Sequence, residues 1–122
     1  MSDEIKNILP PDPEAILEVR NLQKRFVLAK TLMGKPTKEL VAVDNVSFKL
    51  KAGETLGIVG ESGCGKTTLG RTILRLYDVT DGSAIYTSVD DKGEKSSYDL
   101  AKISKKEFYN LRTELQLIFQ DP

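Results

Sequence analysis

The sequence is organised around one glycine-rich segment, residues 60–68, which fits the phosphate-binding pattern GxxxxGK[ST]. An apolar stretch at residues 55–59 precedes it, and apolar residues at 69, 73 and 76 follow it with helical spacing. We therefore predict a buried strand at 55–59, a tight loop, and a helix that begins near Gly65. A strand, a glycine loop and a helix in this order are typical of an α/β fold that binds nucleotide phosphates.

Each residue type in the loop suits a phosphate site. Glycines lack a Cβ, so the backbone can turn its N–H groups toward an anion. Lys66 supplies a cation for the β- and γ-phosphates at the positive end of the helix, and Thr67 supplies a hydroxyl for the Mg²⁺ that accompanies a nucleoside triphosphate. The predicted nucleotide-binding residues of the loop are Gly60, Glu61, Ser62, Gly63, Cys64, Gly65, Lys66, Thr67 and Thr68.

Several alternatives stay open within this segment. The Thr68 hydroxyl either bonds back to the preceding turn or reaches the α-phosphate. Cys64 either fills the loop as a small residue or is a thiol whose pKa is lowered beside Lys66 and a helix N-terminus. A glycine-rich turn with an exposed lysine and no ligand is the alternative for the whole loop. A dinucleotide-binding GxGxxG loop does not fit, because Thr68 stands where the third glycine belongs.

Size and composition limit the classes of protein that remain. The 122 residues, 39% of them hydrophobic, suffice for one core and are too few for two full domains. Lysine plus arginine equal aspartate plus glutamate at 18 each, so no net field draws in nucleic acid. A single cysteine fits a reducing cytosol, and no apolar run is long enough to cross a bilayer. We predict a flexible tail at residues 1–15 and a folded unit at 16–122.

The rest of the chain predicts strands joined by turns and one more helix. Alternating apolar residues around Leu17 and at 46–50 indicate half-buried strands, which the loop at 31–38 joins as an antiparallel pair. Residues 84–89 read as another strand, followed by a charged turn at 90–95. A capping box at residues 104–107 predicts a helix over 105–112.

Residues 115–119 form a final apolar run, which predicts a second buried strand. Gln120 follows it directly and is a functional candidate, because open α/β sheets bind ligands at the carboxyl ends of their strands. The alternative is an ordinary polar residue at a strand terminus.

From residue 17 to 122 the sequence resembles the N-terminal part of an ABC transporter ATP-binding subunit. The motifs that carry the resemblance are Val-Asp-Asn-Val-Ser-Phe at 43–48, Gly-Glu at 53–54, the glycine loop, and Leu-Ile-Phe-Gln-Asp-Pro at 117–122. The resemblance implies a partial P-loop NTPase core with an N-terminal antiparallel β subdomain. Within the family, the loop sequence is most similar to ATPases of dipeptide and oligopeptide importers.

The resemblance also implies roles for residues in three segments. Gln120 falls in the Q-loop, where the family's glutamine approaches Mg²⁺ and the attacking water. Lys66 and Gln120 are then the catalytic candidates, and Thr67 and Gln120 the metal ligands. Phe26 matches the aromatic platform for adenine, with Val41 or Val43 beside it; the alternative is that Phe26 is a core residue of the antiparallel sheet.

The activity implied for the full subunit is ATP hydrolysis that powers peptide uptake. It implies ATP and Mg²⁺ as cofactors, transmembrane permease subunits and a second ATP-binding subunit as partners, and a peripheral position on the cytoplasmic side of the membrane. The family's Asp-Glu strand, LSGGQ-like signature and histidine switch are absent from the sequence, and the acids at 90–91 after the run at 85–89 read as a hairpin end. We therefore expect an N-terminal fragment that holds ATP without cleaving it and that, alone, is marginally stable or self-associates.

Two other functions remain open on the sequence. The chain could be a non-hydrolysing nucleotide-binding or interaction module. A small P-loop phosphotransferase is the third reading, although the sequence has no NKxD guanine motif and no visible acceptor lid.

Overall fold

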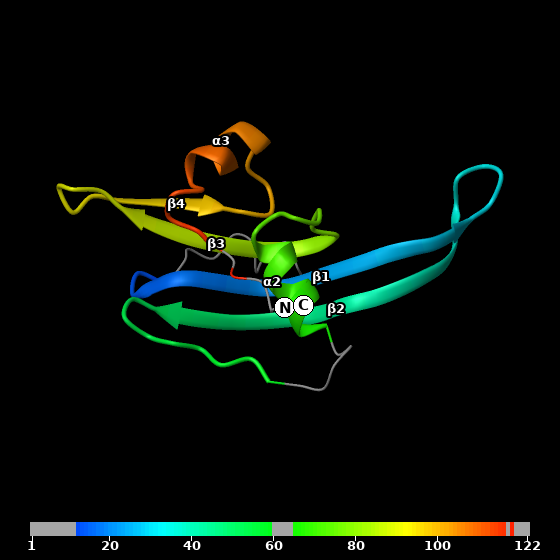
Figure 1. Ribbon diagram of the computed structural model, residues 1–122, viewed down its shortest axis with the longest axis horizontal. Coiled ribbons are helices and arrows are strands. Elements are labelled where there is room, and N and C mark those ends of the chain that lie inside the picture. The colour runs from blue at the N-terminus through cyan, green and yellow to red at the C-terminus, as the bar shows by residue number, and fades with distance from the viewer. Residues whose placement is uncertain (1–11, 60–64, 117, 119–122) are drawn as a thin grey trace.

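A four-stranded antiparallel sheet in the order β2-β1-β3-β4 forms the framework of the protein. The computed structural model describes residues 12–59, 65–116 and 118 (Figure 1). The strands are β1 Ala15–Lys30, β2 Pro36–Lys51, β3 Asp81–Val89 and β4 Lys95–Asp99, and the helices are α2 Lys66–Ile73 and α3 Lys105–Asn110. The sheet is the antiparallel β subdomain that the sequence analysis expects, and β1 starts at Ala15, the last residue of the predicted tail.

Strands β1 and β2 form a long hairpin, part of which extends beyond the rest of the sheet (Figure 1). Pairing of β1 with β3 ends at Gln23, which faces Asp81, whereas pairing with β2 continues to Lys30, which faces Pro36. We call the part formed by residues 24–43 the two-stranded ribbon. The predicted loop at 31–38 is therefore too long: only residues 31–35 form the turn, because strand pairing satisfies the backbone groups of the flanking residues.

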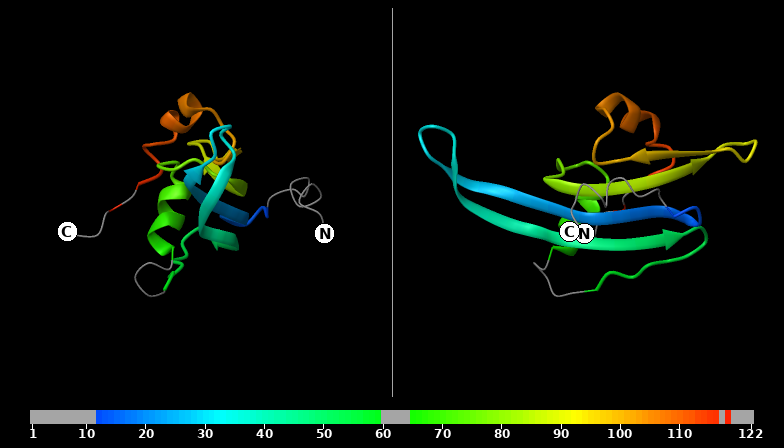
Figure 2. Two further views of the ribbon diagram at one scale, coloured as in Figure 1. Left: turned by 90° about the vertical axis from the view of Figure 1, so that its right-hand side faces the viewer. Right: turned by 180° about the vertical axis from the view of Figure 1, so that it is seen from behind.

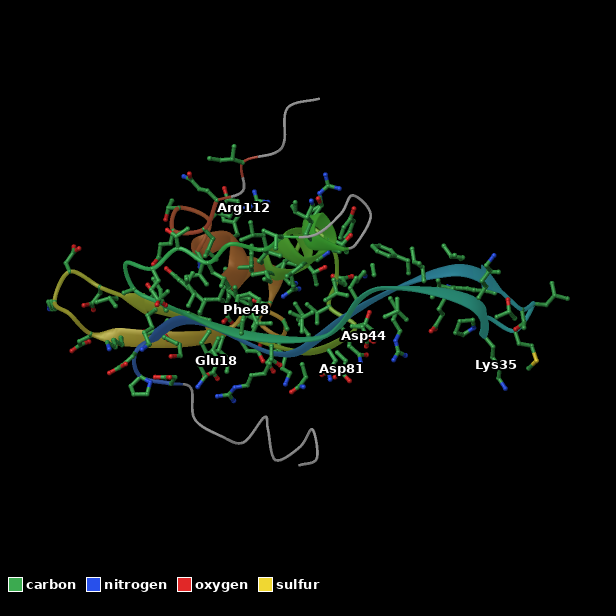
Figure 3. The ribbon with its side chains drawn as sticks, turned by 90° about the horizontal axis from the view of Figure 1, so that it is seen from below. Glu18, Lys35, Asp44, Phe48, Asp81 and Arg112 are labelled. Atoms are coloured by element: carbon green, nitrogen blue, oxygen red, sulfur yellow. The ribbon has the colours of Figure 1, made fainter. Side chains whose placement is uncertain are left out.

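The hydrophobic core lies between one face of the sheet and the segments that cover it. Figure 3 shows α2 and α3 on the same face, and the right panel of Figure 2 views the opposite face, with the strands in front of α2. Buried residues from the sheet, from α2 and from the segments around α3 make up the core: Val19, Leu22, Val43, Leu69, Ala84, Tyr86, Leu100 and Leu111. Of the predicted helical stripe 69, 73 and 76, Leu69 is buried and Leu76 lies exposed beyond the end of α2.

Helix α3 begins where the capping box predicts. The Glu107 backbone N–H donates to Ser104 Oγ over 3.1 Å, so the serine satisfies one of the helix's free N–H groups. Ile103 and Phe108, on either side of this cap, both pack against the core. The helix ends at Asn110, two residues earlier than predicted.

The acidic turn after β3 is a hairpin end, as predicted. Strand β4 pairs with β3 in antiparallel fashion, from Val89 opposite Lys95 to Ile85 opposite Asp99. The Asp90 carboxylate accepts hydrogen bonds from the backbone N–H groups of Lys92 and Glu94, at 2.9 and 2.8 Å. Asp90 therefore stabilises a turn.

Two predicted buried strands are wrong. Residues 55–59 form no strand and are exposed throughout, with Val59 93% accessible. The described residues of the second run, 115, 116 and 118, are not in a strand either, and Ile118 is 92% accessible. A parallel strand forms only where neighbouring strands pair with it and both faces are covered, and the described part of the chain supplies no such neighbours.

A buried tyrosine predicts how stability responds to alkaline pH. Burial, followed by a hydrogen bond from Tyr86 Oη to Glu114 Oε1, raises the pKa of Tyr86 to about 12. An unfolded tyrosine ionises near pH 10. As the pH rises from about 10 to 12, the unfolded state loses this proton and the folded state keeps it, so the free energy of unfolding falls.

We expect absorbance titration to show one of the four tyrosines ionising about two pH units late, and Tyr86→Phe to remove that late component. Between pH 10 and 12 the free energy of unfolding, measured in urea, should also fall less in the variant than in the wild type. A late component that persists in Tyr86→Phe would contradict the assignment.

Candidate functional site

The start of α2 is arranged to receive an anion. Gly65 occupies the N-cap position with φ 95°, no side chain caps the first turn, and that turn carries no acidic residue. The N–H groups of the first turn, which no carbonyl within the helix accepts, and the helix dipole therefore give this end of α2 a positive character. Lys66 and Thr67, the first two residues of the helix, have exposed side chains.

A glycine is required at position 65 for two reasons. Its φ lies in the left-handed region, which side chains with a Cβ rarely adopt. A Cβ at this position would also overlap the carbonyl oxygen of Ala42 in β2. The absence of a side chain thus lets the start of α2 lie directly against the two-stranded ribbon.

An open cavity of about 250 Å³ lies between the ribbon and α2. The ribbon contributes Phe26, Leu40, Val41 and Ala42, and the start of α2 contributes Gly65, Lys66, Thr67 and Thr68. One wall is therefore mostly apolar, and the other combines a cation, two hydroxyls and backbone N–H groups. The shape suits a ligand with a flat apolar part and an anionic part.

Phe26, the predicted adenine platform, lines the apolar wall. It lies in β1 opposite Leu40, is half-buried, and does not belong to the hydrophobic core. The predicted alternative, a core residue of the sheet, thus fits the position of Phe26 less well. Of the two valines considered, Val41 lines the cavity, whereas Val43 is 3% exposed and packs in the core.

The structure brings four of the predicted site residues to Phe26 and leaves others undescribed. Gly65, Lys66, Thr67 and Thr68 share the cavity with it. The remaining predicted residues lie outside the described part of the chain: Gly60, Glu61, Ser62, Gly63, Cys64 and Gln120. Their roles stay predictions.

Sequence reasoning missed two residues that contact Phe26. The Tyr77 ring meets the Phe26 ring edge to face, with centroids 5.2 Å apart, and Lys24 Nζ lies 5.0 Å from the Phe26 centroid. Lys24 was detectable in principle, since residues two apart on a strand share a face. Tyr77 lies in a loop whose path the sequence does not reveal.

Comparison with known proteins bears on the function of this cavity. Residues 43–122 match the ABC transporter family. The chain belongs to the ABC transporter family. The resemblance seen in the sequence motifs is thereby confirmed, and an ABC ATPase-like fold is the correct class.

Similar members of the ABC transporter family act in solute transport according to their names. The oligopeptide transport ATP-binding protein AppF of Bacillus subtilis is 44% identical over 110 residues, and OppF of the same organism is 42% identical over 109. Each match covers 89% of this chain and 31% of the relative. The glutathione import ATP-binding protein GsiA of Escherichia coli is 43% identical over 111 residues, which cover 91% of this chain and 16% of the relative.

The fold also has a solved counterpart. The ATP-binding cassette MJ0796, in a dimeric post-hydrolysis state bound to ADP and Pi, superposes with a TM-score of 0.58 at 23% identity, over 79% of this chain and 34% of that one. The chain spans about a third or less of the length of these curated relatives and of this structure.

Proposed function

We propose that this chain is the ATP-binding part of an ABC transporter ATPase that powers the uptake of small peptides. The observation that carries the proposal is the cavity in which Phe26 faces the first turn of α2. An aromatic ring suits a purine base, and an uncapped helix N-terminus with a lysine suits a phosphate chain. The names of the similar transport proteins support peptides or glutathione as the class of solute.

In this proposal different residues around the cavity bind different parts of the nucleotide. The base stacks on Phe26 beside Val41, and the β- and γ-phosphates lie against Lys66 and the first N–H groups of α2. The glycine loop at 60–64 would complete the phosphate site. Thr68 lies on the cavity wall, within the same turn, where its hydroxyl suits the α-phosphate.

Thr67 suits a Mg²⁺ ion that is bound mainly by phosphate. Its side chain is exposed at the start of α2 and offers a hydroxyl oxygen, and oxygen is the ligand atom that Mg²⁺ prefers. Among the described residues no group of three or more Asp, Glu, Cys or His side chains could hold a metal. A site of one or two protein oxygens, with phosphate oxygens and water as the other ligands, is the usual form for Mg²⁺ with a nucleotide. Gln120 is the proposed second protein ligand.

When ATP is hydrolysed by such a subunit, water attacks the γ-phosphoryl group and charge builds on its oxygens. The contribution we assign to this chain is to position the phosphates and to offset that charge through Lys66. Gln120 would help to orient the water. The family uses an Asp-Glu pair that follows an apolar strand, and a histidine, for the remaining steps; the 122 residues contain neither an apolar run followed by such a pair nor a histidine.

We propose transmembrane permease subunits and a second ATP-binding subunit as partners. The similar proteins are named as transport or import ATP-binding proteins, and the ADP-bound structural counterpart is dimeric. No helix in the described part of the chain has the length and apolarity to cross a bilayer. We propose that these partners hold the chain on the cytoplasmic side of the membrane.

Base recognition can be tested by comparing ATP with tripolyphosphate, which has the phosphate chain and no base. In calorimetry with Mg²⁺, the wild-type chain should bind ATP more tightly. Phe26→Ala should weaken ATP binding about 5- to 30-fold, the effect of losing roughly 1–2 kcal/mol of base stacking, and leave tripolyphosphate binding unchanged. Phe26→Tyr keeps an aromatic ring and should retain the wild-type affinity for ATP. Equal wild-type affinity for ATP and tripolyphosphate would refute base recognition in this cavity.

A further inference from the structure

The Phe26 ring is held by side chains that are not part of the cavity wall. Tyr77 contacts it edge to face, with planes at 90° and centroids 5.2 Å apart, an arrangement favoured by aromatic quadrupoles. Lys24 Nζ lies 5.0 Å from the Phe26 centroid and 5.9 Å from the Tyr77 centroid. Tyr77 and Lys24 do not line the cavity between the ribbon and α2, so they contact the ring without occupying the space for a ligand.

Tyr77 is itself fixed to the end of α2. Arg71 Nη1 donates to Tyr77 Oη over 3.3 Å, and the Tyr77 backbone N–H donates to the Arg71 carbonyl oxygen over 3.4 Å. Arg71 lies in the last turn of the helix whose first turn carries Lys66. One short helix therefore supports both walls of the cavity, the phosphate wall directly and the Phe26 wall through Tyr77.

The loop that carries Tyr77 is also fixed to β1. Lys24 Nζ donates to the Asp78 carbonyl oxygen over 2.7 Å. Thr80 Oγ1 accepts from the Arg25 backbone N–H over 2.9 Å, and the Thr80 N–H donates to the Gln23 carbonyl oxygen over 3.0 Å. These bonds hold residues 77–80 beside the strand that carries Phe26, and so they hold the Tyr77 ring in place.

We propose that Tyr77 is a positioning residue for base recognition, which orients the Phe26 ring so that a nucleotide base can stack on it. This rests on the proposed function. Phe26 lies in the two-stranded ribbon, past the last pairing of β1 with β3, so the β3 strand does not flank it there. A ring that is already oriented loses less conformational freedom when the base binds, so the base binds more tightly.

The test compares Tyr77→Leu, Tyr77→Phe and wild type in calorimetric titrations with Mg-ATP and Mg-tripolyphosphate. Tyr77→Leu should weaken ATP binding about 2- to 10-fold, the effect of an aromatic pair, and leave tripolyphosphate binding unchanged. Tyr77→Phe keeps the edge contact and should retain most of the ATP affinity. Tyr109→Leu is the matched control, because Tyr109 lies on α3, is 67% exposed and does not line this cavity.

The outcomes separate this inference from the function on which it rests. An equal loss of ATP and tripolyphosphate affinity in Tyr77→Leu would show a general structural effect and overturn the positioning role. A wild-type preference for ATP that survives unchanged in Tyr77→Leu would overturn it too, while leaving the proposed function intact. Wild type that shows no preference for ATP would refute the proposed function and this inference together.

Discussion

Lys66→Ala is expected to weaken binding of both ATP and tripolyphosphate about 10- to 150-fold. Lys66 is the first residue of α2, its side chain is exposed, and it lines the cavity beside Thr67. A hydrogen bond that involves a charged group contributes about 1.5–3 kcal/mol, which corresponds to this range of affinity. Because the proposed function places the phosphates against Lys66, the loss should be the same whether or not the ligand carries a base. Calorimetric titration of the two ligands measures it.

Lys106→Ala serves as the control for the loss of one positive charge. Lys106 is exposed on α3 and does not line the cavity, so its removal should change affinity less than twofold at physiological salt. Thermal melting of both variants checks that they stay folded. If Lys66→Ala binds tripolyphosphate as tightly as wild type, the phosphates do not lie at the start of α2.

Gly65→Ala is expected to lower the free energy of unfolding by roughly 2–5 kcal/mol and also to reduce the nucleotide affinity of the molecules that stay folded. The left-handed backbone costs a residue with a Cβ about 1–2 kcal/mol. The new methyl group would overlap the Ala42 carbonyl oxygen. Because this oxygen belongs to the backbone of β2, the overlap can be relieved only if α2 moves away from β2. That movement widens the cavity between Phe26 and Lys66. Urea unfolding and ATP titration measure the two effects.

Substitutions at two other glycines separate the effect of backbone strain from the effect of the overlap with β2. Gly34 has φ 85° in the hairpin turn with open space around it. Gly34→Ala should therefore lower the free energy of unfolding only by the cost of the left-handed backbone, about 1–2 kcal/mol. Gly82 has φ 93°, and a Cβ there would overlap the Asn21 carbonyl oxygen, so Gly82→Ala should cost as much stability as Gly65→Ala. Gly82 does not line the cavity, and its variant should keep wild-type affinity while folded. If Gly65→Ala binds ATP like wild type, close approach of α2 and β2 is not needed for binding.

The features that were predicted correctly have local causes. Ser104 and Glu107 specify the start of α3 within four residues, and alternation around Leu17 specifies a strand whose partner is nearby in the chain. The helix after Gly65 follows from the same kind of signal. The sequence pattern does not indicate strand β4, because Lys95–Asp99 is almost entirely polar and its pairing with β3 depends on the turn at Asp90.

The features that were missed depend on distant neighbours. Apolar residues at 55–59 satisfy the pattern of a buried strand, yet burial requires strands on either side and helices on both faces. In the candidate site, the pairing of Phe26 with the start of α2 came from the family resemblance, since the two segments meet only in the folded chain. The support of Phe26 by Tyr77 left no pattern in the sequence, because it arises from the path of the loop after α2.

The unequal lengths of the strands determine where the protein opens most easily. Among the strands that the structure describes, β1 pairs beyond Gln23 with β2 alone, and a two-stranded hairpin has little stability of its own in water. Amide hydrogens of the ribbon should therefore exchange with solvent sooner than those of β1 that lie between two strands. Phe26 and Leu40 face each other in this ribbon, so a base bound against them would hold its two strands together. Binding of the base would then stabilise the paired ribbon against opening, which would lower the net affinity for the base. The exchange rate of the ribbon amides would fall as the fraction of occupied sites rises.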